Sequence, residues 1–199
     1  YAPKDHPCTT EAVLGGVDPY SASKTAAEFV IAPYRDRLSI SVARSGNAIG
    51  GGDWGKDRLF PDIMRAYQNK TPLHIRHPEA TRPWIHVSEL MYAYLILGKS
   101  NLEGHHTEVF NFGASDSVSV HDILQIVEKY GICPPIIYAD SPPKETQQLS
   151  LNTKKSERVL GWKPVLDPQE SIHWTIEEYR TIPEKRLERM ISRMEFLRP

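Results

Sequence analysis

The spacing of apolar residues changes along the chain between the period of a helix and the short continuous runs of buried strands. Apolar positions on one helix face predict helices at 18–37, 58–69, 88–98, 120–130, 154–160 and 168–179. Short apolar runs predict strands at 39–44, 73–76, 109–112 and 135–138. Helices that alternate with strands are typical of an α/β protein. We therefore expect a parallel-type sheet portion followed by a smaller mixed α/β lobe.

The C-terminal region continues the helical pattern. Beyond Pro183, apolar residues recur at helical spacing, and they are Leu187, Met190, Ile191, Met194 and Leu197. This spacing predicts one more helix with an apolar stripe along one side. We expect that stripe to pack on its own domain and not on a partner.

Composition excludes several classes of partner. The chain has 199 residues, 40% of them apolar, and its Lys plus Arg (24) nearly balance its Asp plus Glu (25). This balance gives no electrostatic reason to bind nucleic acid or an anionic membrane surface. No apolar run approaches the roughly 18 residues of a membrane span. The only two cysteines, Cys8 and Cys133, favour a reducing compartment. We expect a cytoplasmic protein.

The first predicted helix carries candidate chemistry. Tyr20 and Lys24 lie four residues apart and so share one helix face. Asp18 suits the N-cap, Pro19 the first helical position, and Pro33 should kink or end the regular part. An ammonium next to a phenol favours the phenolate, which makes tyrosine usable as a general acid or base. The spacing alone is common, and an ordinary exposed pair is the plainer interpretation of it. The small residues around the pair favour a catalytic role.

A glycine-rich loop follows the first predicted strand and nearly matches two phosphate-binding motifs. Gly50-x-Gly52-x-x-Gly55 has the spacing of a dinucleotide fingerprint, and the same stretch matches a P-loop up to Lys56. Asp57 then stands where a P-loop needs Ser or Thr, and its negative charge argues against phosphate there. In a dinucleotide fingerprint the glycines form the strand-to-helix turn itself, and here they come too late. We favour a ligand-contacting loop over a merely flexible one and over a fingerprint.

Four stretches of the sequence carry a resemblance to known enzymes. Pro-Tyr-Ser-Ala-Ser-Lys-Thr-Ala-Ala-Glu at 19–28 resembles the active-site helix of the extended short-chain dehydrogenase/reductase superfamily. Arg-Ser-Gly-Asn-Ala-Ile-Gly-Gly-Gly-Asp-Trp at 44–54 and Thr-Arg-Pro-Trp-Ile-His-Val at 81–87 look like the corresponding segments of CDP-glucose 4,6-dehydratases. The stretch 151–164 is similar to the closing helix motif of that family. The resemblance covers nearly the whole chain up to about Tyr179.

The resemblance implies a Rossmann-like fold that binds NAD. By position, Tyr20 and Lys24 would polarise the sugar 4-hydroxyl and hold the nicotinamide ribose, and Ser45 would lie near the nicotinamide. Residues 1–72 would form the C-terminal part of the NAD-binding domain with its catalytic helix. Residues 73–199 would form mainly the substrate-binding lobe, with elements interleaved with the sheet.

The resemblance also implies a substrate site. Asn47, Arg58 and the Leu59 backbone would face the diphosphate of a nucleotide sugar. Arg82 would supply a planar fork for phosphate oxygens, and Arg76 would lie towards the nucleotide. A solvated surface charge is an equal alternative for Arg58 and for Arg76. For Arg82, held between Thr and Pro before a bulky Trp, we favour the functional interpretation.

The implied activity is NAD-dependent dehydration of CDP-glucose to CDP-4-keto-6-deoxyglucose by a homo-oligomer, a dimer or a tetramer. The glycine-rich NAD fingerprint and a second acid/base set would precede Tyr1, so we expect the chain to be the C-terminal part of a longer protein. Another NAD-dependent sugar-nucleotide epimerase or dehydratase is an alternative. A non-catalytic sugar-nucleotide-binding module and an oligomer-forming scaffold are two more.

A metal site is not expected. The eight histidines include no His-Glu-x-x-His spacing. We interpret His86 as a buried histidine that pairs with a backbone group.

Overall fold

Parallel pairing dominates the computed structural model, which describes residues 1–2, 7–16, 18–104, 108–141, 146–181 and 183–197. The strands in these residues are β1 (Val42–Ser45), β2 (Ala48–Ile49), β3 (Leu73–Ile75), β4 (Thr81–Arg82), β5 (Ile85–His86), β6 (Val109–Phe112), β7 (Val118–Ser119) and β8 (Ile136–Tyr138). Strand β1 pairs with β6, β2 with β5 and β3 with β8, all in parallel, while β4 and β7 are antiparallel. Parallel strands need long crossover connections, and helices supply them here.

The helices surround these strand pairs. They are α1 (Pro19–Ile31), α2 (Leu59–Asn69), α3 (Val87–Leu102), α4 (Val120–Lys129), α5 (Lys154–Leu160), α6 (Pro168–Arg180) and α7 (Arg186–Phe196), with short 3₁₀ turns at Ala32–Tyr34 and Pro183–Lys185. Within the part of the chain that the structure describes, no helix has the length and apolar character that a membrane crossing requires. The expected α/β class, with a partial Rossmann-like parallel sheet and a mixed lobe, is confirmed.

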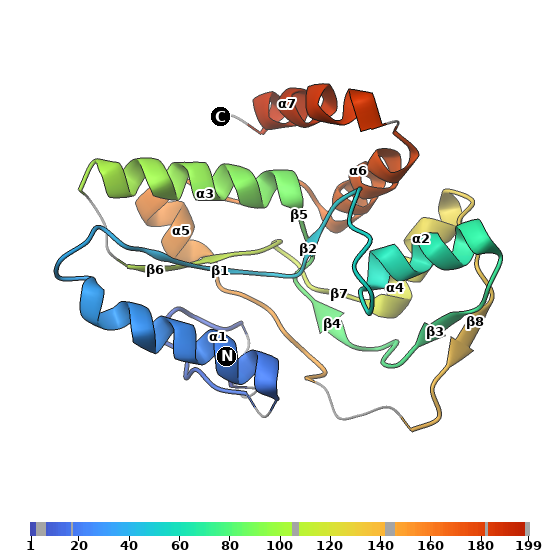
Figure 1. Cartoon of the computed structure of the whole chain (residues 1–199), viewed down its shortest axis with the longest axis horizontal. Coiled ribbons are helices and arrows are strands. Elements are labelled where there is room, and N and C mark those ends of the chain that lie inside the picture. The colour runs from blue at the N-terminus through green and yellow to red at the C-terminus, as the bar shows by residue number, and fades with distance from the viewer. Residues whose placement is uncertain (3–6, 17, 105–107, 142–145, 182, 198–199) are drawn as a thin grey trace.

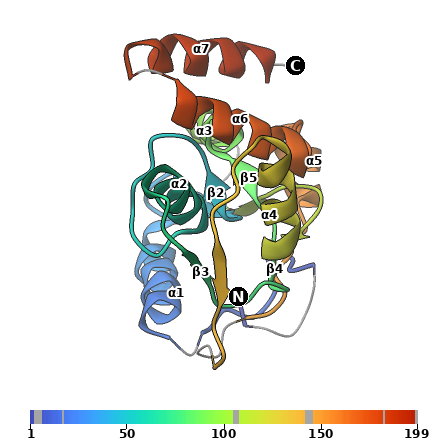
Figure 2. The same ribbon diagram turned by 90° about the vertical axis from the view of Figure 1, so that its right-hand side faces the viewer.

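Two buried clusters hold the elements together. One lies between the β1–β6 pair and helices α3 and α5, with Phe110, Phe112 and Trp162 at its centre. Helix α1 lies on the opposite face of that pair (Figure 1). The other cluster joins α2, α4 and α6 to β3, as the turned view shows (Figure 2). The expected division at residue 72 stays a prediction.

Local signals placed most helix ends correctly. Asp18 caps α1 by accepting a hydrogen bond from the Ser21 N–H at 3.0 Å, and Pro33 lies in the 3₁₀ turn that ends this helix. Gly161 ends α5 in the left-handed conformation, at φ 67°. The predicted end of α3 at residue 98 is wrong, because the helix continues through Gly98 to Leu102. Gly98 lies inside the helix and has no positive φ, so this glycine marks no turn.

The two-residue strands were missed. Strand β2 lies in the segment predicted as a glycine-rich loop, and β4 lies between the strand predicted at 73–76 and the helix predicted at 88–98. Strand β1 also begins later than predicted, at Val42, because its register is set by pairing Val42 with Val109. Strands this short carry no period of their own and form only where a distant partner lies alongside.

Helix α7 packs differently from the prediction. Of the predicted stripe, Leu197 is buried, but Leu187, Met190 and Ile191 remain 63%, 40% and 50% exposed. The expectation that this stripe packs on its own domain therefore holds for Leu197 but is wrong for those three residues. The side chain that turns inward is Arg193, which is only 6% exposed. Its guanidinium lies 4.5 Å from the Trp174 ring and pairs with acidic groups of α6.

Candidate functional site

A cleft of about 580 Å³ opens between α1, the loop after β1, the N-terminus of α2 and the ends of β3 and β4. All the predicted site residues except Lys24 line it, namely Tyr20, Ser45, Asn47, Arg58, Leu59, Arg76 and Arg82. They come from segments up to 62 residues apart in the chain, counted from Tyr20 to Arg82. The fold thus brings the predicted residues to one place, while their individual roles stay predictions.

Tyr20 and Lys24 form one edge of this site. The Lys24 Nζ lies 5.5 Å from the centroid of the Tyr20 ring, so the ammonium faces the aromatic system as the helical spacing predicts. Tyr20 is 70% exposed. Its hydroxyl is therefore open to a ligand that approaches along the surface of α1.

Arg44 fixes α1 against the sheet. Its guanidinium donates two hydrogen bonds of 2.7 Å to the Glu28 carboxylate in a fork-to-fork arrangement, and both side chains are largely buried. It also donates to the Tyr1 hydroxyl and to the Thr10 carbonyl oxygen, each at 2.9 Å. One arginine of β1 therefore sets the position of the helix that carries Tyr20.

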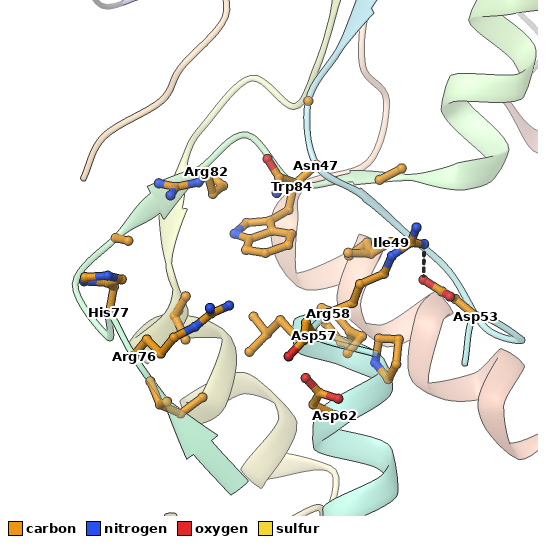
Figure 3. A pocket seen from close by; sticks show the side chains of 18 of the residues that line it. Asn47, Ile49, Asp53, Asp57, Arg58, Asp62, Arg76, His77, Arg82 and Trp84 are labelled. Atoms are coloured by element: carbon orange, nitrogen blue, oxygen red, sulfur yellow. Dashed lines mark hydrogen bonds and ion pairs between the residues drawn. The ribbon is translucent and has the colours of Figure 1, made fainter. Parts of the chain in front are cut away.

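Arg58 stands at the N-cap of α2 with an extended backbone. Its Nη1 donates to the Asp53 Oδ2 at 2.8 Å (Figure 3), and Asp53 also accepts from the Gly55 N–H at 2.8 Å. Partial burial of Asp53 works against ionisation, but these hydrogen bonds and the Arg58 charge hold the pKa of this carboxyl below its usual value. The first turn of α2 also lines the cleft, and the free N–H groups of a helix N-terminus attract anions.

Two further arginines face the same space from the other side. Arg82 is buried, and its Nη1 donates to the Thr81 carbonyl oxygen at 2.8 Å, which holds the side chain in place. Arg76 follows the end of β3 and reaches into the cleft from there (Figure 3). Three arginines and a helix N-terminus line this cleft together with Asp53, Asp57 and Asp62, and the guanidinium groups are the side chains in it that suit the oxygens of a diphosphate.

Ser45 and Asn47 lie at the carboxyl end of β1. Ligands of parallel α/β sheets bind outside the carboxyl ends of the strands, so the location suits a binding role. Gly46 between them runs against Pro83, where an added Cβ would stand 2.1 Å from the Pro83 carbonyl oxygen. The Asn47 carbonyl oxygen accepts from the Ile85 N–H at 3.0 Å. This backbone contact sets where the loop enters the cleft.

The glycines of this loop serve packing against a helix. A Cβ on Gly51 would stand 2.1 Å from the Glu178 Cβ of α6, and one on Gly50 would stand 2.5 Å from the Val87 Cγ1. The loop lines the cleft, as expected for a ligand-contacting loop, but these two glycines allow close approach to protein. This geometry agrees with setting the dinucleotide fingerprint aside.

Sequence reasoning missed several residues of the cleft. Asp53, His77 and Trp84 line it, and the Trp84 Nε1 donates to the Val118 carbonyl oxygen at 3.2 Å. Asp53 and Trp84 lie inside stretches that carried the resemblance, but nothing in their spacing marks them as cleft residues. The interpretation of His86 is confirmed, since it is buried and its Nδ1 accepts from the Ser88 backbone N–H at 3.2 Å. Among the described residues, no group of three or more His, Cys, Asp or Glu side chains is arranged to hold a metal ion.

Comparison with known sequences identifies the family of this chain. A family model described as the NAD dependent epimerase/dehydratase family matches residues 1–113. The CDP-glucose 4,6-dehydratase of Salmonella typhimurium is 36% identical over an alignment of 168 residues, with 76% of this chain and 47% of that protein covered. The UDP-glucose 4-epimerase of Lactobacillus helveticus is 25% identical over 187 residues, with 81% and 55% covered. The chain spans about half the length of these curated relatives.

Solved structures show the same fold. A UDP-glucuronic acid 4-epimerase from Bacillus cereus, in complex with UDP-glucuronic acid and NAD, superposes with a TM-score of 0.81 at 18% identity and covers 90% of this chain and 58% of that one. A dTDP-glucose 4,6-dehydratase from Bacillus anthracis in complex with NAD gives a TM-score of 0.78 at 22% identity, with 91% and 58% covered. At such identities the likeness shows the fold alone.

Proposed function

The chain belongs to the NAD dependent epimerase/dehydratase family, and from this premise we propose that the enzyme containing it dehydrates CDP-glucose to CDP-4-keto-6-deoxyglucose. One observation carries the proposal. An exposed tyrosine with a lysine beside it lies on the rim of a cleft lined by three arginines. The similarity to a CDP-glucose 4,6-dehydratase supports the choice of nucleotide and of reaction.

The family is NAD dependent, and the residues present fit that cofactor. Ser45 is exposed at the carboxyl end of a parallel strand, and Tyr20 and Lys24 present a hydroxyl and an ammonium from α1. In our proposal Lys24 donates to the ribose hydroxyls of the cofactor, and Ser45 lies towards its nicotinamide. When bound, NAD would supply the hydride acceptor for oxidation of the sugar at C4 and the hydride donor for the later reduction at C6.

Tyr20 carries the proton transfer in this proposal. Its phenolate oxygen takes the proton of the 4-hydroxyl as C4 becomes a carbonyl, with the Lys24 ammonium beside it. The C5–H bond becomes acidic only beside that carbonyl. Water then leaves across C5 and C6, which explains why an enzyme without net redox change needs a redox cofactor.

The arginines hold the diphosphate. Arg58 and Arg82 approach it from opposite sides, and the first-turn N–H groups of α2 at Leu59 add hydrogen-bond donors. Asn47 is assigned to the same diphosphate and Arg76 to the nucleotide. Fixing these remote parts of the substrate holds the sugar beside Tyr20. We also expect the enzyme to be a homo-oligomer.

Calorimetry on the purified chain tests the binding half of this proposal. We expect CDP-glucose to bind at least about tenfold more tightly than UDP-glucose or dTDP-glucose, a difference of about 1.4 kcal/mol. Equal binding of the three would contradict the choice of base. No binding of any of them would remove the cleft from sugar-nucleotide chemistry.

The second candidate is epimerisation, which similarity to several epimerases favours. Turnover in deuterium oxide separates the two reactions. Dehydration removes the C5 proton and takes a proton back from solvent, so the product carries deuterium at C5. Epimerisation through C4 oxidation leaves C5–H intact. A product without deuterium at C5 and with inverted C4 would establish the epimerase instead.

A further inference from the structure

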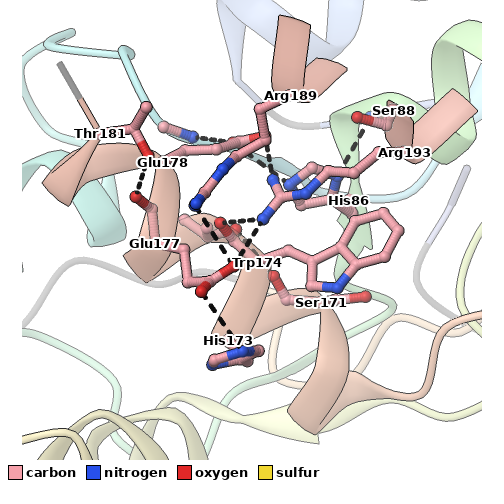
Figure 4. Close-up of polar contacts among 12 residues, drawn as sticks. His86, Ser88, Ser171, His173, Trp174, Glu177, Glu178, Thr181, Arg189 and Arg193 are labelled. Atoms are coloured by element: carbon pink, nitrogen blue, oxygen red, sulfur yellow. Dashed lines mark hydrogen bonds and ion pairs between the residues drawn. The ribbon is translucent and has the colours of Figure 1, made fainter. Parts of the chain in front are cut away.

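One carboxylate of α6, that of Glu178, meets three separate segments of the chain (Figure 4). Its Oε2 accepts a hydrogen bond from the Gly51 N–H at 2.6 Å and lies 3.3 Å from the His86 Nε2. Its Oε1 accepts from Arg193 of α7. A single side chain therefore joins the cleft loop, β5 and α7.

The hydrogen bonds of His86 show which of its ring nitrogens donates to Glu178. Its Nδ1 accepts from the Ser88 N–H, which leaves Nε2 as the donor towards Glu178. Burial works against ionisation of Glu178, but the donors His86 and Gly51 and the nearby positive charge of Arg193 lower the pKa of the carboxyl. The carboxylate is thus ionised and fully engaged, which makes it a strong acceptor for the Gly51 N–H.

Arg193 is held as firmly as its partner. It is 6% exposed, its guanidinium lies 4.5 Å from the Trp174 ring, and its Nη2 donates to the Trp174 carbonyl oxygen at 3.1 Å. The same nitrogen lies 3.2 Å from the Glu177 Oε2. A buried arginine with this many partners keeps Glu178 in one rotamer.

Further along the loop, Asp53 and Trp54 also contact the last turn of α6. The Tyr179 hydroxyl donates to the Asp53 carbonyl oxygen at 2.6 Å, and the Trp54 ring meets the Tyr179 ring edge to face with centroids 5.2 Å apart. The Asp53 carboxylate in turn holds Arg58. The last turn of α6 therefore contacts the loop at Gly51, Asp53 and Trp54, between Asn47 and Arg58.

We propose that Glu178, fixed by Arg193, is the positioning residue for the loop of residues 46–58, and that α7 thereby sets the affinity of the cleft. The inference about affinity rests on the function proposed above. The close approach at Gly51 makes the arrangement sensitive, because the loop backbone lies directly against α6.

The test compares two adjacent glutamates of α6. Glu178→Gln keeps the side-chain shape but replaces one acceptor oxygen with an NH₂ group, which cannot accept from its neighbours. Glu177→Gln is the matched control, since Glu177 also contacts Arg193 but contributes no bond to Gly51. The readouts are amide hydrogen exchange across residues 46–58 in the free chain, calorimetric affinity for CDP-glucose, and the melting temperature.

We expect Glu178→Gln to speed exchange across the loop about tenfold and to weaken CDP-glucose binding about tenfold. Glu177→Gln should change both by less than about twofold. Arg193→Lys keeps the charge, and it should move loop exchange and affinity in the same direction by about threefold. In the Glu178→Gln background it should have no further effect on affinity, because it acts through that carboxylate.

A lower melting temperature in Glu178→Gln with unchanged loop exchange would overturn the inference and leave a merely structural role. If Glu178→Gln does not fold, unchanged exchange in Arg193→Lys overturns it equally. Failure of the wild-type chain to bind CDP-glucose would overturn the proposed function, and loop exchange would still decide the positioning role of Glu178.

Discussion

The two walls of the cleft are held in opposite ways. Helix α1, which carries Tyr20 and Lys24, has no buried residue and is tied to the sheet through the pair of Glu28 and Arg44. The opposite wall, the loop of residues 46–58, is bonded to the last turn of α6 at several points. The difference matches the two tasks. A proton-transferring group must be reached by substrate and cofactor, whereas anion binding gains most from donors fixed in advance.

The largest effect of a substitution is expected at Tyr20, on the wall of the cleft that α1 forms. Tyr20→Phe in the enzyme that contains this chain should lower kcat by at least about 10³-fold, because the ring remains but the proton acceptor is lost. CDP-glucose affinity should stay within twofold, since the diphosphate contacts lie on the other wall. Steady-state kinetics and calorimetry measure the two quantities. Tyr34→Phe, in the 3₁₀ turn that follows α1, is the control, and equal losses in both variants would contradict the role of Tyr20.

The second-largest effect is expected when the ion pair that holds α1 against the sheet is removed. Arg44→Met leaves the Glu28 carboxylate largely buried without its partner, and such losses cost about 3 to 5 kcal/mol of the free energy of unfolding. Urea denaturation measures this loss. Arg35→Met, on the turn just after α1, should cost far less. A loss below about 1 kcal/mol in Arg44→Met would mean that α1 is held by other contacts.

The carboxyl groups of Glu89 and Glu178 should affect the pH dependence of stability in opposite ways. Glu89 of α3 is 2% exposed, and its Oε1 accepts from the Val165 and Leu166 N–H groups at 2.6 and 3.0 Å. Burial raises the pKa of Glu89 above its ordinary 4.5 despite these two donors, whereas the pKa of Glu178, with its cationic partner, is lowered. The two buried carboxyls therefore respond to pH with opposite signs.

For Glu89 the folded state holds its proton more tightly than the unfolded state. Its contribution to stability is present below pH 4.5 and is lost as the pH rises through the folded value, by up to about 1.4 kcal/mol per pH unit in that window. Glu89→Gln keeps an acceptor oxygen and removes the titration. Urea midpoints from pH 4 to 8 should therefore fall less in the variant than in the wild type, and parallel curves would contradict this assignment.

The smallest effect is expected at Arg58, in the loop of residues 46–58, where a substitution should change ligand affinity but not stability. Arg58→Gln removes a charge whose ion pair with Asp53 is solvent exposed. The free energy of unfolding should therefore change by less than about 0.5 kcal/mol. Affinity for CDP-glucose should nevertheless fall about tenfold, because a charge-assisted bond to phosphate is lost. Lys56→Gln, the neighbouring exposed cation, should leave affinity within twofold. Calorimetry measures the affinity of both variants and urea denaturation their free energy of unfolding. Equal affinities of the two variants would contradict the role of Arg58.

Much of this site was predictable because its signals are local. Asp18 and Pro19 begin α1 as expected, and the spacing of Tyr20 and Lys24 places them together on any regular helix. The paired arginine and glutamate were not predictable, since Arg44 and Glu28 meet only when the strand and the helix pack. The same is true of Arg193, since no pattern in the sequence marks it as a buried side chain of a helix whose apolar residues stay largely exposed.

The sequence alone determined the α/β alternation, the helix that carries Tyr20 and Lys24, and the polar loop beside it, because each depends on neighbours within a few turns. Only the tertiary structure decided that Arg58, Arg76 and Arg82 surround one cleft, and that Glu178 holds Gly51 across 127 residues. Contacts over such separations depend on how whole elements pack, and the order of residues along the chain does not specify that geometry by any short-range rule.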